Sequence, residues 1–337
     1  MWHFSTDGLT IYSPSGNVLK THLKKSLCRP YSSPYSPGTI SEDCYFFDYA
    51  SDGHKYVWAS AMGGTHRVEA FDIDSGDYAG YIETCSTPLD LKYHASREEM
   101  WLRCADKSGE HMGEIDVFSS NSLSTGLDQV YLNDTARPYG RIAVDSAMGN
   151  YGYVTAYNAN YISEIDLSSK EVNEKFTIEK AHGAYDLTFS PINNHIYFRT
   201  RVCCTCGASA DVESCGRGDP KPVLVQTGPS ASEIEQNGVC SGGCEGSRAD
   251  TIGVAEFDTV NKVFIANHNI KVGTGFGADP VTSPDGVHIL LLPNDGGQNV
   301  RVLRAGQNGE ASVSTKSDNS LITNTSLVRD SSYLYLP

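Results

Sequence analysis

Six of the ten cysteines crowd into one stretch, where thiols can form disulfides or bind zinc. Cys203-x-x-Cys206 and Cys240-x-x-x-Cys244 have the spacing of zinc ligands. However, Gly, Ser and Asp dominate the stretch and it contains no histidine. An even number of cysteines in a chain of short strands favours a disulfide framework instead. We therefore expect three disulfides, with zinc or free thiols as the alternatives, among Cys203, Cys204, Cys206, Cys215, Cys240 and Cys244.

The other four cysteines can close two smaller loops. Cys85 and Cys104 flank an expected β-hairpin, and antiparallel neighbours can bring such a pair within disulfide range. Cys28 and Cys44 bracket a loop rich in Pro, Ser and Tyr, which a second disulfide can close in the same way. Because disulfides persist in oxidising compartments, the cysteine content favours an extracellular, secreted protein.

One tripeptide inside the cysteine-rich stretch has the chemistry of an adhesion ligand. In Arg217-Gly218-Asp219, a guanidinium and a carboxylate flank a glycine that permits a tight turn. An integrin-type receptor needs these two groups splayed from an exposed turn, with the carboxylate completing the coordination of a metal. The simpler interpretation is a flexible turn before Pro220.

An acidic segment resembles half of a calcium loop. Asp72-Ile-Asp-Ser-Gly-Asp77 is followed by Glu83 at the twelfth position of the EF-hand pattern. However, the glycine is fifth instead of sixth, and residues 78–83 have the pattern of a strand. We therefore expect a turn between two strands at this place, and we expect no resident metal or other cofactor.

Two sequons and the missing catalytic motifs also bear on function. Asn133 follows an expected outer strand and precedes a loop that contains proline, so we expect it to be exposed and glycosylated. Asn324 belongs to the second sequon but lies in an expected inner strand. The sequence contains no nucleophile elbow, P-loop or dinucleotide fingerprint, which favours a protein that is not an enzyme.

Composition excludes several classes of partner. The 337 residues carry 41 Asp and Glu against 26 Lys and Arg, which gives a net charge of −15. An acidic surface repels phosphate backbones and anionic lipids, so neither nucleic acid nor membrane insertion is expected. Residues 1–8 have no basic region and no apolar region of a signal peptide. Secretion therefore implies a signal sequence that this chain does not contain.

A repeated strand pattern predicts the architecture. Residues 68–76 and 162–169 each form an apolar strand that ends in Asp and closes with Ser-Gly or Ser-Ser. Further apolar strands follow both, with a spacing of about 40 to 50 residues, the size of a four-stranded propeller blade. The expected blades are 44–84, 88–132, 138–178, a fourth that starts at 184 and resumes at 252 after an insertion, and 278–315.

The two ends of the chain supply the remaining blade. Strands at 9–12 and 18–23 and strands at 321–328 and 333–336 together make four. A ring closed in this way has no open edge strands. We predict an all-β fold, with residues 1–337 forming a single β-propeller domain of about six blades. The count is seven if residues 24–43 or the disulfide-rich insertion at 202–250 contain further strands.

Several phrases resemble a known family. Gly63-Gly-Thr-His-Arg67, Thr282-Ser-Pro-Asp-Gly286 and the Cys85 and Cys104 pair resemble the C-terminal propeller of the larger follistatin-related secreted proteins. Ile165-Asp-Leu-Ser-Ser169 resembles the broader YVTN-type propeller repeats. The resemblance covers most of the chain loosely and implies an extracellular, non-catalytic propeller. It does not imply calcium binding, because the EF-hand module of that family is missing from this sequence.

These observations favour a secreted binding or structural module of an extracellular matrix, coat or filament. The expected partner is an extracellular protein or a glycan, or further copies of the chain in a polymer. The insertion is expected to project from the ring and carry the partner surface. The alternative functions are an integrin-type ligand and a metal-dependent hydrolase or lyase that uses the central channel. The second alternative depends on His66, His182, Asp90 and Asp186.

Overall fold

The computed structural model describes somewhat more than half of the chain. The described residues are 2–5, 8–13, 15–23, 31–32, 40–41, 45–62, 67–85, 88–104, 113–124, 126–132, 140–155, 161–177, 182–201, 251–268, 279–283, 286–292, 301–305, 311–315 and 331–334.

The described residues form almost entirely β-structure, so the all-β prediction is confirmed. They make six four-stranded sheets and one two-stranded sheet, β4 (Tyr31–Ser32) with β5 (Ile40–Ser41). Two single-turn helices, η1 (Ala95–Arg97) and η2 (Ser146–Met148), connect strands. Within the described residues, no helix has the length and apolar character of a membrane span.

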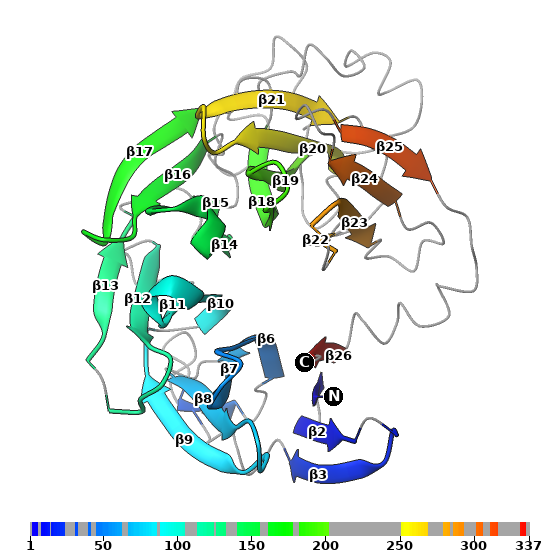
Figure 1. Cartoon of the computed structure of the whole chain (residues 1–337). Helices are drawn as coiled ribbons and strands as arrows, with labels where there is room; N and C mark the ends of the chain where they lie inside the picture. Colours follow the sequence, from blue (N-terminus) through cyan, green and yellow to red (C-terminus); the bar gives the residue numbers. More distant parts are fainter. Residues whose placement is uncertain are drawn as a thin grey trace. The chain divides into compact units, whose positions relative to one another are not determined.

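Three of the four-stranded sheets lie where the repeat pattern predicts blades in the first half of the chain (Figure 1). The first is β6 (Tyr45–Ser51), β7 (Tyr56–Met62), β8 (Arg67–Asp72) and β9 (Tyr78–Glu83). The second is β10 (Pro88–His94), β11 (Glu99–Cys104), β12 (Glu114–Ser119) and β13 (Asp128–Tyr131). The third is β14 (Ile142–Ala143), β15 (Tyr151–Thr155), β16 (Tyr161–Asp166) and β17 (Glu171–Thr177).

Two more sheets follow along the chain in the same strand order. One is β18 (His182–Ser190), β19 (His195–Arg201), β20 (Thr251–Asp258) and β21 (Val263–His268). The other is β22 (Asp279–Thr282), β23 (His288–Leu292), β24 (Arg301–Ala305) and β25 (Ala311–Thr315). The insertion predicted at 202–250 separates β19 from β20, and it lies outside the described residues.

The sixth sheet joins the two ends of the chain. Its order is β26-β1-β2-β3, with β26 (Ser331–Leu334), β1 (Trp2–Ser5), β2 (Gly8–Tyr12) and β3 (Val18–Leu23). β1 pairs antiparallel with β26, from Trp2 opposite Leu334 to Ser5 opposite Ser331. We predicted two strands from each end, but the described residues supply three from the N-terminal region and one from the C-terminal region. The expected strand at 321–328 lies outside the described residues.

The chain forms two compact units. The first comprises Met1–Ser146, Asp166–Val172 and Ser326–Pro337, and the second comprises Ala147–Ile165 and Asn173–Thr325.

One turn chemistry recurs between the third and fourth strands. The Asp72 carboxylate accepts the backbone N–H groups of the residues two and three positions ahead, at 3.2 and 2.7 Å. Asp166 does the same at 2.7 and 3.0 Å, and Asp258 at 2.8 and 2.9 Å. Aspartate favours such turns because its short side chain can satisfy nearby backbone donors. The calcium-like segment at Asp72 is therefore a turn.

Aromatic side chains fill the core of each unit. In the first, the Trp58 ring contacts Phe118 edge to face, and its Nε1–H donates to the carbonyl of Ser120 at 3.0 Å. In the second, Phe257 lies edge to face with both Tyr153 and Phe264. Burial of such large rings is a major source of folding free energy, and it fixes the register of the strands that carry them.

Candidate functional site

Two aspartates on the first strands of their sheets bind the next sheet along the chain. Asp48 on β6 and Asp90 on β10 both lie where the register with the second strand shifts. Asp48 Oδ2 accepts the N–H of Leu91 at 2.9 Å, and Asp90 Oδ2 accepts the N–H of Ile142 at 2.6 Å. A break in register can re-aim a side chain in this way. Each carboxylate therefore holds the first strand of the following sheet.

Two cations complete this inner aspartate cluster. Lys92 Nζ lies 2.8 Å from Asp48 Oδ2 and 2.8 Å from Asp90 Oδ1, and Arg141 Nη1 lies 3.3 Å from Asp90 Oδ1. Burial opposes ionisation of Asp48, but the charges of Lys92 and Arg141 and a hydrogen bond from Asp90 lower its pKa overall. Burial raises the pKa of Asp90, and the neighbouring Asp48 charge adds to that effect.

The ion pairs of Asp90 argue against the metal-binding role that the sequence analysis considered for it. An ammonium and a guanidinium already neutralise the inner aspartate cluster and would repel a divalent cation. Asp186 similarly pairs with Arg199, 3.1 Å away. His66 lies outside the described residues, and the side chain of His182 on β18 is not described. The structure thus pairs both candidate aspartates with cations.

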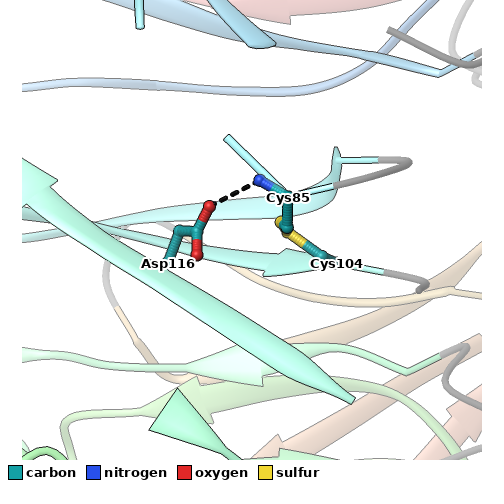
Figure 2. Close-up of side chains that lie close together, drawn as sticks. All are labelled: Cys85, Cys104 and Asp116. Atoms are coloured by element: carbon teal, nitrogen blue, oxygen red, sulfur yellow. Dashed lines mark hydrogen bonds between the residues drawn. A yellow bond between two sulfur atoms is a disulfide. The ribbon is translucent and has the colours of Figure 1, made fainter. Parts of the chain in front are cut away.

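A second group combines a disulfide with a buried carboxyl (Figure 2). Cys85 in the β9–β10 connection and Cys104 at the end of β11 form a disulfide, with Cα atoms 6.1 Å apart. Asp116 on β12 faces this bond, and its Oδ2 accepts the N–H of Cys85 at 2.6 Å. All three side chains are buried, with relative exposures of 8%, 0% and 0%.

The spacing of this group would also suit a metal ion. One carboxylate oxygen and the two sulfurs lie within 4.8 Å of one another, which among the described residues is the one such set of three. A metal needs thiolate ligands, however, and sulfurs that are bonded to each other are not thiolates. The disulfide therefore prevents the two sulfurs from binding a metal, and the Asp116 carboxyl is the group of the three that can gain or lose a proton.

The ionisation of Asp116 differs from that of an ordinary aspartate. Burial raises its pKa, because the charged form loses its hydration in an apolar cluster. Hydrogen bonds from the Cys85 N–H and from the side chains of Gln129 and Glu114 oppose this effect without cancelling it. The structure therefore places a carboxyl with a raised pKa beside a buried disulfide.

A third group lies in the second unit and was not anticipated from the sequence. Glu256 on β20 is completely buried. Its carboxylate lies 2.6 Å from His195 Nδ1, 2.8 Å from the Tyr197 hydroxyl and 2.7 Å from His268 Nε2. Burial opposes ionisation, but these three partners lower the pKa of Glu256 to about 2. Because an ionised carboxylate only accepts hydrogen bonds, all three neighbours act as donors.

Most of the sites predicted from the sequence lie outside the described residues. This applies to Arg217, Gly218 and Asp219, to Asn133 and Asn324, and to Cys28, Cys44, Cys203, Cys204, Cys206, Cys215, Cys240 and Cys244. Among the described predictions, the structure brings together Cys85 and Cys104 as a disulfide. The one signal that could have pointed to Glu256 is its position between the apolar residues Ala255 and Phe257 of a buried strand.

Comparison with known proteins gives a fold but no family. No family model matches the chain. The chain is 23% identical over 120 residues to the ATP-dependent zinc metalloprotease FtsH of Mycoplasmopsis pulmonis (strain UAB CTIP). That region is 35% of this chain but only 16% of the protease, so the chain spans a small part of that relative's length.

Two solved structures resemble the chain along most of its length. A functionally unknown protein from Desulfotomaculum acetoxidans DSM 771 is 11% identical, with a TM-score of 0.56 over 93% of this chain and 78% of that protein. A chain of Kuenenia stuttgartiensis hydrazine synthase is 13% identical, with a TM-score of 0.57 over 98% of this chain and 80% of its own length. At such identities the likeness shows a shared fold and nothing about activity.

Proposed function

We propose that the chain is a closed β-propeller of about six blades. Six four-stranded sheets repeat along the sequence, and three of them share the same Asp-centred turn, which supports a blade repeat. The pairing of β26 with β1 supports closure, because it places both chain ends in one sheet. Deleting residues 331–337 then removes the closing strand and should lower the melting temperature markedly. An unchanged melting temperature would contradict closure.

We further propose that this propeller is a secreted, non-catalytic binding or structural module of an extracellular matrix, coat or filament. The observation that carries this proposal is the inner aspartate cluster, where the carboxylates are engaged by backbone N–H groups and cations from neighbouring strands. Carboxylates that are already bound by backbone N–H groups, a lysine and an arginine are poorly available to a substrate or a metal. A propeller scaffold leaves its surface loops to bind a protein, a glycan or another copy of the chain.

The extracellular part of this proposal rests on the cysteines. A disulfide between Cys85 and Cys104 fits an oxidising compartment, and eight further cysteines are available for others. Thiol titration of the denatured, unreduced protein tests the compartment. We expect few or no free thiols, whereas ten free thiols would rule out the extracellular assignment.

Metal analysis tests the non-catalytic part of the proposal. Protein purified without chelators should contain no stoichiometric metal, and Asp90→Asn should leave its metal content unchanged while it lowers stability through loss of an ion pair. A stoichiometric ion that disappears in Asp90→Asn would favour the metal-dependent hydrolase or lyase instead.

A further inference from the structure

The two sulfurs of the Cys85–Cys104 disulfide lie in unequal surroundings. Cys104 is completely buried, whereas Cys85 retains 8% of its exposure. Both belong to an apolar cluster that also contains Trp58, Leu91 and Leu102. Cys85 is therefore the more accessible of the two residues, and attack on its sulfur would make Cys104 the leaving group. A thiolate released inside an apolar cluster is poorly solvated, and this opposes cleavage.

Asp116 is placed to relieve that cost. One of its carboxyl oxygens lies within 4.8 Å of both sulfurs. Its Oδ2 accepts the Cys85 N–H at 2.6 Å, and this hydrogen bond holds the carboxyl beside the disulfide. Figure 2 shows the carboxyl and the disulfide facing each other from β12 and β11. General acids that are loosely aligned in the resting state can tighten as a reaction proceeds.

We propose that Asp116 is the proton donor for exchange between the Cys85–Cys104 disulfide and low-molecular-weight thiols. A thiolate of the reductant attacks Cys85 Sγ, the bond between the two sulfurs breaks, and its electron pair goes to Cys104 Sγ. The Asp116 carboxylic acid gives its proton to that sulfur and becomes a carboxylate. A second reductant thiolate then attacks the reductant sulfur bound to Cys85, which yields oxidised reductant and the Cys85 thiolate.

The groups around Asp116 are compatible with its role as a proton donor. Burial keeps its pKa above the ordinary value, so the acid form persists at higher pH than in an exposed aspartate. Within the described residues, the groups that act on its ionisation are the Cys85 N–H, Gln129 of β13 and Glu114 of its own strand. On β11, the residue opposite Asp116 is the apolar Leu102. None of these is a cation that would fix the carboxyl in its charged form.

The test is the rate of reduction of this one disulfide in the full-length protein. Wild type, Asp116→Asn and Asp116→Glu are treated with excess monothiol, alkylated at timed intervals and analysed by mass spectrometry for the peptides that contain Cys85 and Cys104. Asp128→Asn is the matched control, because it removes an exposed carboxylate from β13 of the same sheet. Melting temperatures establish that each variant is folded.

We expect Asp116→Asn to slow reduction by about tenfold or more, in line with the usual contribution of a general acid. In the wild type, the rate per reductant thiolate should fall as pH rises through the pKa of Asp116. Asp116→Asn should lose this dependence, Asp116→Glu should retain it, and Asp128→Asn should behave as the wild type. Equal rates and equal pH profiles in wild type and Asp116→Asn would overturn the proposal. Neither result depends on ring closure or on the compartment of the protein.

Discussion

Asp116 and Glu256 are two completely buried carboxyl groups in equivalent strands, yet their pKa values shift in opposite directions. Each lies on the third strand of a four-stranded sheet, Asp116 on β12 and Glu256 on β20. The pKa of Asp116 is raised, whereas that of Glu256 is lowered to about 2. Burial opposes ionisation in both cases, so burial alone does not decide which form the folded protein holds.

The difference comes from the donors that the surrounding strands supply. Glu256 receives hydrogen bonds from two imidazoles and a phenol, contributed by strands on both sides of β20. Asp116 has one short backbone donor, the Cys85 N–H. The side chains of Gln129 and Glu114 also favour its charged form, but they do not cancel the effect of burial on its pKa. A buried carboxylate with several dedicated donors is a structural charge. A buried carboxyl with few donors is a group that can hold and release a proton.

The largest loss in the free energy of unfolding is expected from Glu256→Ala. The substitution leaves His195, Tyr197 and His268 without their common acceptor and also opens a cavity. Removing one member of a buried charged network typically costs about 3–5 kcal/mol. We expect a loss of that size in the free energy of unfolding, measured by denaturant titration. Asp116→Ala should cost clearly less, and an equal loss in both variants would refute the distinction.

The pH dependence of stability should differ in sign between the two carboxyl groups. The folded pKa of Glu256, about 2, lies below its ordinary value of 4.5. Its stabilisation is therefore complete above pH 4.5 and is lost as pH falls towards 2, by about 3 kcal/mol in total. Subtracting the stability of Glu256→Gln from that of the wild type at each pH isolates this contribution. A difference that does not change between pH 4.5 and 2 would contradict the assignment.

Much of the fold could be predicted from local sequence signals. The turn aspartates Asp72, Asp166 and Asp258 lie at the ends of apolar strands, where the turn needs a side chain that accepts nearby N–H groups. Strand β1 was missed, because four residues at a chain end carry no clear alternation. Its two neighbours in the sheet are β2, which follows it directly, and β26, from the other end of the chain.

The chemistry of the buried groups could not be predicted in the same way. Glu256 lies 61 residues from His195 and Asp116 lies 31 residues from Cys85. The pairing of β19 with β20 brings the first two together, and the packing of the β9–β10 connection against β12 brings the second two together. Asp90 was named as a candidate residue of a metal-dependent hydrolase or lyase, but the sequence did not show that Lys92 and Arg141 both pair with it. Residue types reveal candidate groups, whereas partners that set their ionisation come from tertiary structure.

A smaller effect should follow from removing one donor of Glu256. Tyr197→Phe deletes the hydroxyl that lies 2.8 Å from Glu256 Oε1 but keeps the buried ring. Glu256 retains both imidazole donors, so we expect a loss of about 1 kcal/mol, the usual net value of one hydrogen bond. Because fewer donors then stabilise the carboxylate, the pKa of Glu256 should rise, so the acid-induced loss of stability should be smaller and should end at a higher pH. Tyr131→Phe, which removes an exposed hydroxyl from β13, is the control and should change neither quantity.

The smallest equilibrium effect is expected at Asp116 itself. Asp116→Asn keeps the size of the side chain and an oxygen that can accept the Cys85 N–H, so stability near pH 4 should change by less than about 0.5 kcal/mol. Above that pH the wild type is increasingly penalised, because the folded state holds the Asp116 proton more tightly than the unfolded chain does. The stability of the wild type relative to Asp116→Asn should therefore fall as pH rises from the ordinary aspartate pKa of 3.8 through the raised folded value. Denaturant titrations across this range measure the slope, and a relative stability that rises with pH would mean that Asp116 is held as a charged group, like Glu256.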